Sequence, residues 1–105
     1  MDKGVEFVGE KTTVGWEKFL TLIEQALAVP GQLGALFSLL FTLEEKETLA
    51  TRVLLVIELL KGELTHREIA QYLNVSIAKI TRGSNALKLV TPELKKFLLE
   101  SASLI

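Results

Sequence analysis

Two short helical patterns between Gly62 and Lys88 place the strongest constraint on how this chain folds. Each follows a hydroxyl residue that can cap a helix: Thr65, which is spaced from Glu68 to form a capping box, and Ser76. Only a few residues separate the two predicted helices, 66–73 and 77–88, so we expect them to cross steeply. This spacing is typical of a helix-turn-helix, in which the second helix enters the DNA major groove.

The N-terminal part of the chain predicts an arm followed by an amphipathic helix. Residues 1–12 alternate charge with glycine and show no helical stripe, so we expect a flexible N-terminal arm. From Thr13 onward, apolar residues recur at steps of three and four up to Leu27. Pro30 and Gly31 then end the helix.

Two further helices are predicted before the helix-turn-helix. The first, 32–41, is apolar on nearly all sides, which favours burial. The second begins at Thr42, which is spaced from Glu45 to form another capping box, and runs to Lys61. Gly62 then suits the left-handed turn that commonly closes a helix.

A last helix is predicted after Thr91, because Pro92 follows this cap residue at the first helical position. The sequence therefore predicts an all-α fold of six helices. Residues 13–105 are expected to form one domain, which we divide into dimerisation helices (13–61), the helix-turn-helix (65–88) and a C-terminal helix (91–103).

The apolar content of the chain predicts a partner. The chain has 105 residues and is 49% apolar, whereas a monomer of this size buries only roughly two-thirds of its unfolded surface. We therefore expect an interwound homodimer, in which the first three helices of each subunit complete the other's core. Twofold symmetry also suits paired readers, which need a fixed spacing of about 34 Å on DNA.

The net charge of −1 hides a segregation of charge. Residues 1–60 carry five basic and nine acidic side chains, whereas residues 61–96 carry seven basic and three acidic ones. The positive charge therefore falls on the predicted DNA reader, where phosphates require it. Charge alone leaves open the alternative of a solvated surface that is segregated by chance.

Several classes of protein are disfavoured. There is no cysteine and only one histidine, His66, so thiolate and histidine-built metal sites are not expected. No signal peptide is evident, and the apolar run 53–60 is too short to cross a bilayer and contains Glu58. Without a glycine-rich phosphate loop, an enzyme is the least favoured class. We expect a soluble cytoplasmic protein.

Helical spacing divides the reader helices into two faces. Ile69, Ala70 and Leu73 are expected to pack inward from the first helix, and Ile77, Ile80 and Leu87 from the second. Arginine can bond two acceptors of guanine at once, a role we assign to Arg67. The candidate DNA-contacting residues are His66, Arg67, Ile77, Ala78, Lys79, Thr81 and Lys88. The alternative is that they are ordinary solvated residues.

The segment TRGSNALK, preceded by REIAQYLNVSIAKI and by LATRVLLVIELLKGEL, resembles the tryptophan repressor family. The likeness runs from about Phe41 to Leu99. It implies an interwound dimer that binds L-tryptophan as corepressor, needs no other cofactor, and then binds operator DNA. By the resemblance, Arg52 and Arg82 sandwich the indole ring, and Arg82 also binds the carboxylate. The alternative for Arg52 is a surface ion pair with a glutamate such as Glu45.

The resemblance also implies a partner for the ligand's ammonium group. Backbone carbonyls of Leu39 and Phe41 would hold it, because the end of a helix attracts cations. Thr42 would line the same pocket, and Gly83 would leave room beside the ring. A plain alternative is that Gly83 lets two helices approach closely.

The chain departs from well-known members of that family at four positions. Ala86 stands where some carry a serine that helps to bind the ammonium, so affinity or ligand choice is expected to shift. Ala70 replaces a lysine used on DNA, and Lys79 replaces a threonine, as though one positive charge had moved between the reader helices. Leu54 replaces a basic residue.

Two other functions stay open. One is a ligand-independent DNA-binding protein of the same fold. The other is a structural or interaction dimer whose helix-turn-helix is vestigial, which would show no salt-dependent DNA binding.

Overall fold

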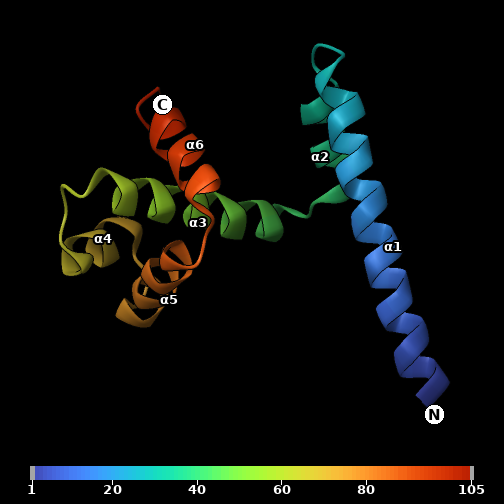
Figure 1. Ribbon diagram of the computed structural model, residues 1–105, viewed down its shortest axis with the longest axis horizontal. Coiled ribbons are helices and arrows are strands. Elements are labelled where there is room, and N and C mark those ends of the chain that lie inside the picture. Colours follow the sequence, from blue (N-terminus) through green and yellow to red (C-terminus); the bar gives the residue numbers. More distant parts are fainter. Residues whose placement is uncertain (1, 105) are drawn as a thin grey trace. The chain divides into compact units, whose positions relative to one another are not determined.

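The computed structural model describes the backbone of residues 2–104 and the side chains of residues 9–104. Regular structure in this part of the chain is entirely helical, which confirms the predicted all-α class (Figure 1). The helices are α1 (Asp2–Leu27), α2 (Gln32–Leu40), α3 (Leu43–Lys61), α4 (His66–Leu73), α5 (Ile77–Lys88) and α6 (Pro92–Ala102).

Three of the predicted helix starts are fixed by side-chain caps. The Thr65 hydroxyl accepts from the backbone N–H of Glu68 at 3.1 Å, and the Glu68 carboxylate accepts from the N–H of Thr65 at 2.9 Å. The hydroxyls of Ser76 and Thr91 cap α5 and α6 at 3.2 and 3.1 Å. These bonds satisfy backbone donors that the first helical turn leaves free. The predicted caps are therefore confirmed, while the capping box at Thr42 stays a prediction.

Left-handed residues close α3 and α4, and the one at Gly62 was expected from the sequence. Gly62 has a φ of +67° directly after α3, and Asn74 has a φ of +53° directly after α4. Glycine and asparagine adopt this conformation at the lowest cost. The turn between α4 and α5 is consequently short, because Ser76 caps α5 two residues after Asn74.

The first helix begins earlier than the sequence predicts. α1 starts at Asp2, whereas apolar periodicity places its start at Thr13. The Thr13 hydroxyl donates to the carbonyl of Gly9 one turn earlier, at 3.1 Å. The stretch contains no proline. Extending an existing helix is more favourable than nucleating a new one, because each added residue forms one more backbone hydrogen bond. Met1 lies outside the described residues, and the mobility of the predicted arm 1–12 stays a prediction.

The chain divides into two compact units. The N-terminal unit ends at Thr42, and the C-terminal unit begins at Leu43. In the N-terminal unit α2 packs against the C-terminal part of α1 (Figure 1). Four rings join the two helices with centroids 5.3 to 6.2 Å apart: those of Trp16, Phe19, Phe37 and Phe41.

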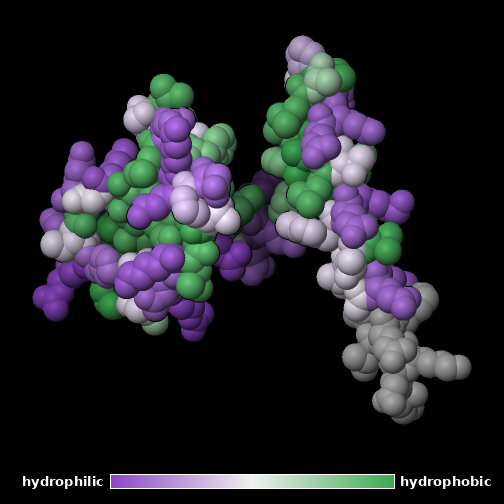
Figure 2. All heavy atoms as spheres, viewed as in Figure 1, coloured by the Kyte–Doolittle hydropathy of each residue, from purple (hydrophilic) through white to green (hydrophobic). Residues whose placement is uncertain are grey.

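No side chain described between residues 9 and 42 is buried. Trp16 is 60% exposed and Leu39 is 79% exposed. Hydrophobic residues gather over α2 and the part of α1 beside it (Figure 2). Among the described side chains, residues 9–42 therefore form no buried core in the single chain.

In the C-terminal unit α3 packs against α4, α5 and α6 (Figure 1). The sequence grouped this helix with the dimerisation segment 13–61, whereas the structure places it with the reader helices α4 and α5. Leu55 from α3 joins Ile69, Ala70 and Ile80 in one buried cluster.

Four of the six residues predicted to face inward from the reader helices belong to the buried cluster or pack against it: Ile69, Ala70, Leu73 and Ile80. Ile69 and Ile80 are fully buried, and Leu73 packs against the same cluster. Ile77 is 49% exposed, so its assignment to the inward stripe is wrong. Helical side chains tilt toward the N-terminus, and Ile77 begins its helix, so there is no earlier turn of α5 for it to cover. No helix in residues 2–104 has the length and apolarity needed to cross a bilayer.

Candidate functional site

A cavity of about 770 Å³ lies within the C-terminal unit. Its walls come from α3, the last residue of α4 and the turn after it, α5, Val90 in the connection to α6, and one residue of α6. Pockets for small organic ligands commonly measure about 300–1,000 Å³. Much of the lining is apolar and is contributed by Leu55, Val56, Leu73, Val75, Leu87, Val90 and Leu98.

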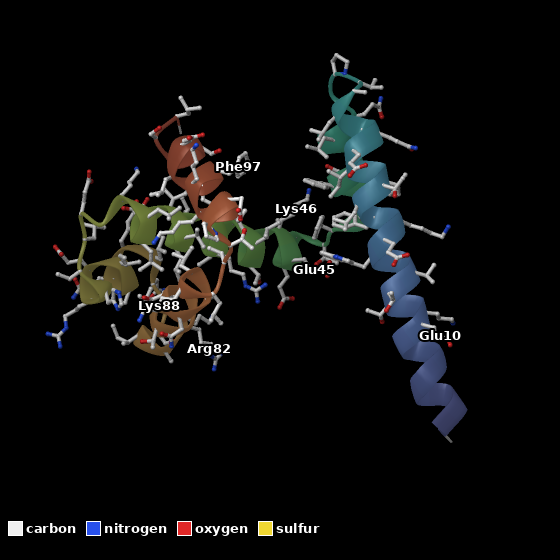
Figure 3. All side chains as sticks on the ribbon, viewed as in Figure 1. Glu10, Glu45, Lys46, Arg82, Lys88 and Phe97 are labelled. Atoms are coloured by element: carbon white, nitrogen blue, oxygen red, sulfur yellow. The ribbon has the colours of Figure 1, made fainter. Side chains whose placement is uncertain are left out.

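The cavity brings together two arginines that are distant in the sequence. Arg52 lines it from α3 and Arg82 lines it from α5. Figure 3 shows Arg82 on α5, the helix that also carries Lys88. A guanidinium can stack on an aromatic face and can bind a carboxylate with two parallel hydrogen bonds. An apolar cavity with two such groups therefore suits an aromatic acid.

Gly83 of α5 packs closely against α3. A Cβ atom added at this glycine would collide with the Leu55 side chain and would lie 3.5 Å from Cδ1 of Leu59. Because Leu55 belongs to the buried cluster, a shift of its side chain would disturb the packing of that cluster. The alternative that Gly83 permits a close helix approach is thus confirmed, and Gly83 also lines the cavity.

Two threonines on α3 add polar groups to the cavity wall. The hydroxyls of Thr48 and Thr51 each donate to a backbone carbonyl one turn earlier, at 3.0 Å. Both residues line the cavity, as does Glu47. Since each hydroxyl proton is already used, these oxygens can act toward a ligand only as acceptors.

Three predicted ligand residues belong to the N-terminal unit. Leu39 lies in the last turn of α2, Phe41 follows that helix, and Thr42 ends the unit. The backbone N–H of Phe41 donates to the carbonyl of Phe37 at 2.9 Å. None of the three lines the cavity described above, and their part in ligand binding stays a prediction.

Comparison with known proteins assigns the chain to a family. The model of the Trp repressor protein family matches residues 14–102. A Trp operon repressor homolog of Chlamydia caviae is 47% identical over 89 residues, covering 85% of this chain and 87% of the relative. Homologs of the same name from Chlamydia trachomatis serovar D and Aliivibrio fischeri are 49% and 46% identical, covering 80% and 81% of this chain and 88% and 78% of the relatives. The chain belongs to the Trp repressor family.

The Trp repressor family consists of DNA-binding regulators rather than enzymes, so this chain is a repressor-like regulator of transcription. The sequence-based assignment to the family is confirmed. Among the side chains that the structure describes, those of residues 9–104, no group of acidic, histidine or cysteine residues could hold a metal ion.

Most of the residues predicted to contact DNA in this Trp repressor family member lie at the starts of α4 and α5. His66 and Arg67 occupy the first turn of α4, and Ile77, Ala78 and Lys79 occupy the first turn of α5. All seven residues predicted to contact DNA, including Thr81 and Lys88, are exposed. Their exposure leaves them available to DNA, and the contacts themselves stay predictions.

One titratable group at the reader helices has a perturbed pKa. The backbone N–H and the side chain of Thr65 both hydrogen-bond to Glu68 and lower the pKa of its carboxyl. The negative charge also lies in the first turn of α4, where the helix dipole favours an anion.

Sequence reasoning missed several residues of the cavity wall. It assigned Lys79 to DNA, yet this residue lines the cavity as well. It did not name Thr48, Thr51 or Glu47 as site residues. Helical spacing from the two arginines could have identified some of these residues. Thr48 and Val56 lie four residues before and after Arg52, and Lys79 lies three residues before Arg82, so each shares a helix face with an arginine.

Proposed function

We propose that this chain is a tryptophan-dependent transcriptional repressor. A homodimer binds L-tryptophan as its corepressor and then binds operator DNA through α4 and α5, in the cytoplasm. No other cofactor takes part, and the regulated genes serve tryptophan biosynthesis or uptake.

The shared cavity of Arg52 and Arg82 is the observation that carries this proposal. An indole ring placed among the apolar lining residues would have a guanidinium available from α3 and another from α5. Arg82 would also bind the carboxylate, because planar guanidinium matches its two oxygens. The ligand's ammonium would meet the carbonyls of Leu39 and Phe41 beside Thr42, at a helix end that attracts cations.

Placement of Arg82 on a reader helix supports a coupling between ligand and DNA. A ligand that binds one arrangement of α4 and α5 more tightly shifts the population toward that arrangement. Linkage then requires that DNA raise the affinity for the ligand by the same factor. Arg67, with its exposed position at the start of α4, is the proposed base-reading residue.

The exposed apolar surface supports a homodimer. Monomeric proteins rarely expose large contiguous apolar patches, yet Trp16, Leu20, Leu22 and Leu39 are each more than 40% exposed in the N-terminal unit. A second copy would bury this surface, and twofold symmetry is the commonest arrangement of such assemblies. Phe97, 61% exposed, stands out from α6 and adds to the uncovered surface (Figure 3).

Calorimetry with L-tryptophan tests the ligand assignment. We expect the wild type to bind, and Arg82→Ala to lose at least about tenfold in affinity, because a charge-assisted bidentate contact is removed. Arg67→Ala is the matched control, since it removes an exposed arginine that does not line the cavity. A wild type that binds no tryptophan, or an unchanged affinity in Arg82→Ala, contradicts the proposal.

DNA binding with and without tryptophan separates the remaining functions. A repressor of this kind binds its operator more tightly with the ligand and loses affinity steeply as salt rises. Equal affinity in both conditions would instead favour a ligand-independent DNA-binding protein. Absence of salt-dependent binding would favour a structural dimer.

A further inference from the structure

We propose that Lys79 belongs to the ligand site rather than to the DNA contacts, and that its ammonium and the guanidinium of Arg82 together hold the carboxylate of the ligand. This inference rests on the proposed function. It assigns a ligand-specificity role to a residue that helical position alone would place on DNA.

The position of Lys79 is set by the local structure of α5. Its backbone N–H donates to the Ser76 cap at 3.2 Å, which fixes the residue in the first turn. Arg82, Gly83 and Ala86 follow at steps that keep one face of the helix, and all four residues line the cavity. The face of α5 that carries Arg82 toward the cavity therefore carries Lys79 as well.

Charge in the cavity favours an anionic ligand group near α5. Three cationic side chains line it, Arg52, Arg82 and Lys79, against one acidic residue, Glu47. Like charges that share one site repel each other, and an anion between them relieves the repulsion. The carboxylate of an amino acid is the part of the proposed ligand that supplies such a charge.

Lys79 and Arg82 are the residues of α5 in the cavity lining whose side chains can bind a carboxylate. Gly83 and Ala86 have no polar side-chain atom, and the next residue of this face, Leu87, is apolar. Residues three apart on a helix are neighbours, so an ammonium and a guanidinium at positions 79 and 82 can flank the same carboxylate. Hydrogen bonds between ionised groups of this kind are stronger than neutral ones.

The proposed role of Lys79 changes which residues contact DNA. An ammonium engaged with the ligand's carboxylate is not free to neutralise a phosphate, so Lys79 drops out of the contacts made with tryptophan bound. Lys88 lies at the other end of α5 and does not line the cavity, and it remains a phosphate candidate.

Calorimetry without DNA tests the ligand role. We expect Lys79→Met to bind L-tryptophan about tenfold more weakly, and Lys79→Arg, which keeps the charge, to stay within about threefold of the wild type. Lys95→Met removes an exposed positive charge from α6 and should bind as the wild type does. Wild-type affinity in Lys79→Met overturns the proposal, and so does an equal loss in Lys79→Arg and Lys79→Met.

The salt dependence of DNA binding at saturating tryptophan tests whether Lys79 contacts a phosphate. Lys79→Met should keep the wild-type slope, whereas Lys88→Met should lower it by about 0.9 for each phosphate that the protein no longer neutralises. A lower slope in Lys79→Met returns this residue to the DNA and overturns the inference. If the wild type binds no tryptophan, the proposed function itself fails, and that result is seen before any variant is compared.

Discussion

Gly83 of α5 packs against Leu55 of α3, and this contact predicts the sign of the stability change in Gly83→Ala. An alanine in a helix interior normally stabilises by about 1 kcal/mol relative to glycine. Here the added methyl group meets the buried Leu55 side chain, and overpacking a core costs about 1–3 kcal/mol. We expect Gly83→Ala to lower the free energy of unfolding by roughly 1 kcal/mol, measured by urea denaturation.

Two comparisons isolate this contact. Gly15→Ala, in α1, adds a methyl group that meets nothing within 4 Å, so it should stabilise or leave stability unchanged. With Leu55→Ala already present, Gly83→Ala should no longer destabilise, because the collision is gone. A stabilising effect of Gly83→Ala in the otherwise wild-type chain would contradict the contact.

Single residues also show where sequence reasoning reached its limit. It named Arg52 and Arg82 through family resemblance, and the structure places both in one cavity. For Gly83 it left two explanations open, because only the packed structure reveals that Leu55 lies opposite. Lys79 was assigned to DNA because the sequence shows its position on a reader helix. The sequence does not show which residues line the cavity.

Among the helices, the start of α4 carries a predicted pH dependence. The folded pKa of Glu68 lies below its unfolded value, so its contribution to stability is full above the unfolded pKa, about 4.3, and is lost as pH falls through the folded pKa. Glu68→Gln keeps an acceptor for the Thr65 N–H but does not titrate.

Urea unfolding of the two proteins over the acid range measures this effect. The difference in unfolding free energy between wild type and Glu68→Gln should be constant near neutral pH and should shift against the wild type below the ordinary glutamate pKa. The change is expected to be small, because the residue is exposed. A difference that is constant throughout the acid range would show that the capping box does not depend on the charge.

Helix boundaries were predictable where a side chain or a glycine determines them. Thr65, Ser76 and Thr91 cap their helices as expected, and Gly62 ends α3 in the left-handed conformation. The start of α1 was not predictable in this way, because apolar periodicity marks where a helix packs rather than where it begins. The assignment of α3 to the dimerisation helices stays a prediction, because a helix that is apolar on several faces does not reveal every neighbour it packs against.

At the scale of the whole molecule, the proposed homodimer predicts concentration-dependent stability. A partner that binds the folded chain raises its apparent stability by mass action. We therefore expect the unfolding midpoint temperature to rise with protein concentration. Leu20→Glu, which places a charge on the exposed apolar surface of α1, should reduce this dependence. A midpoint independent of concentration, with a monomeric mass in sedimentation, would contradict the homodimer.

Because none of the side chains described between residues 9 and 42 is buried, the proposed dimerisation affects how the regulator responds to its own abundance. If the N-terminal unit forms a core only in the homodimer, then at low expression the number of dimers follows the square of the number of chains. Doubling the number of chains then yields roughly four times as many dimers. Repression would then depend on the concentration of this protein as well as on the concentration of tryptophan. A cell that makes little of this protein would silence its target weakly even when the amino acid is plentiful.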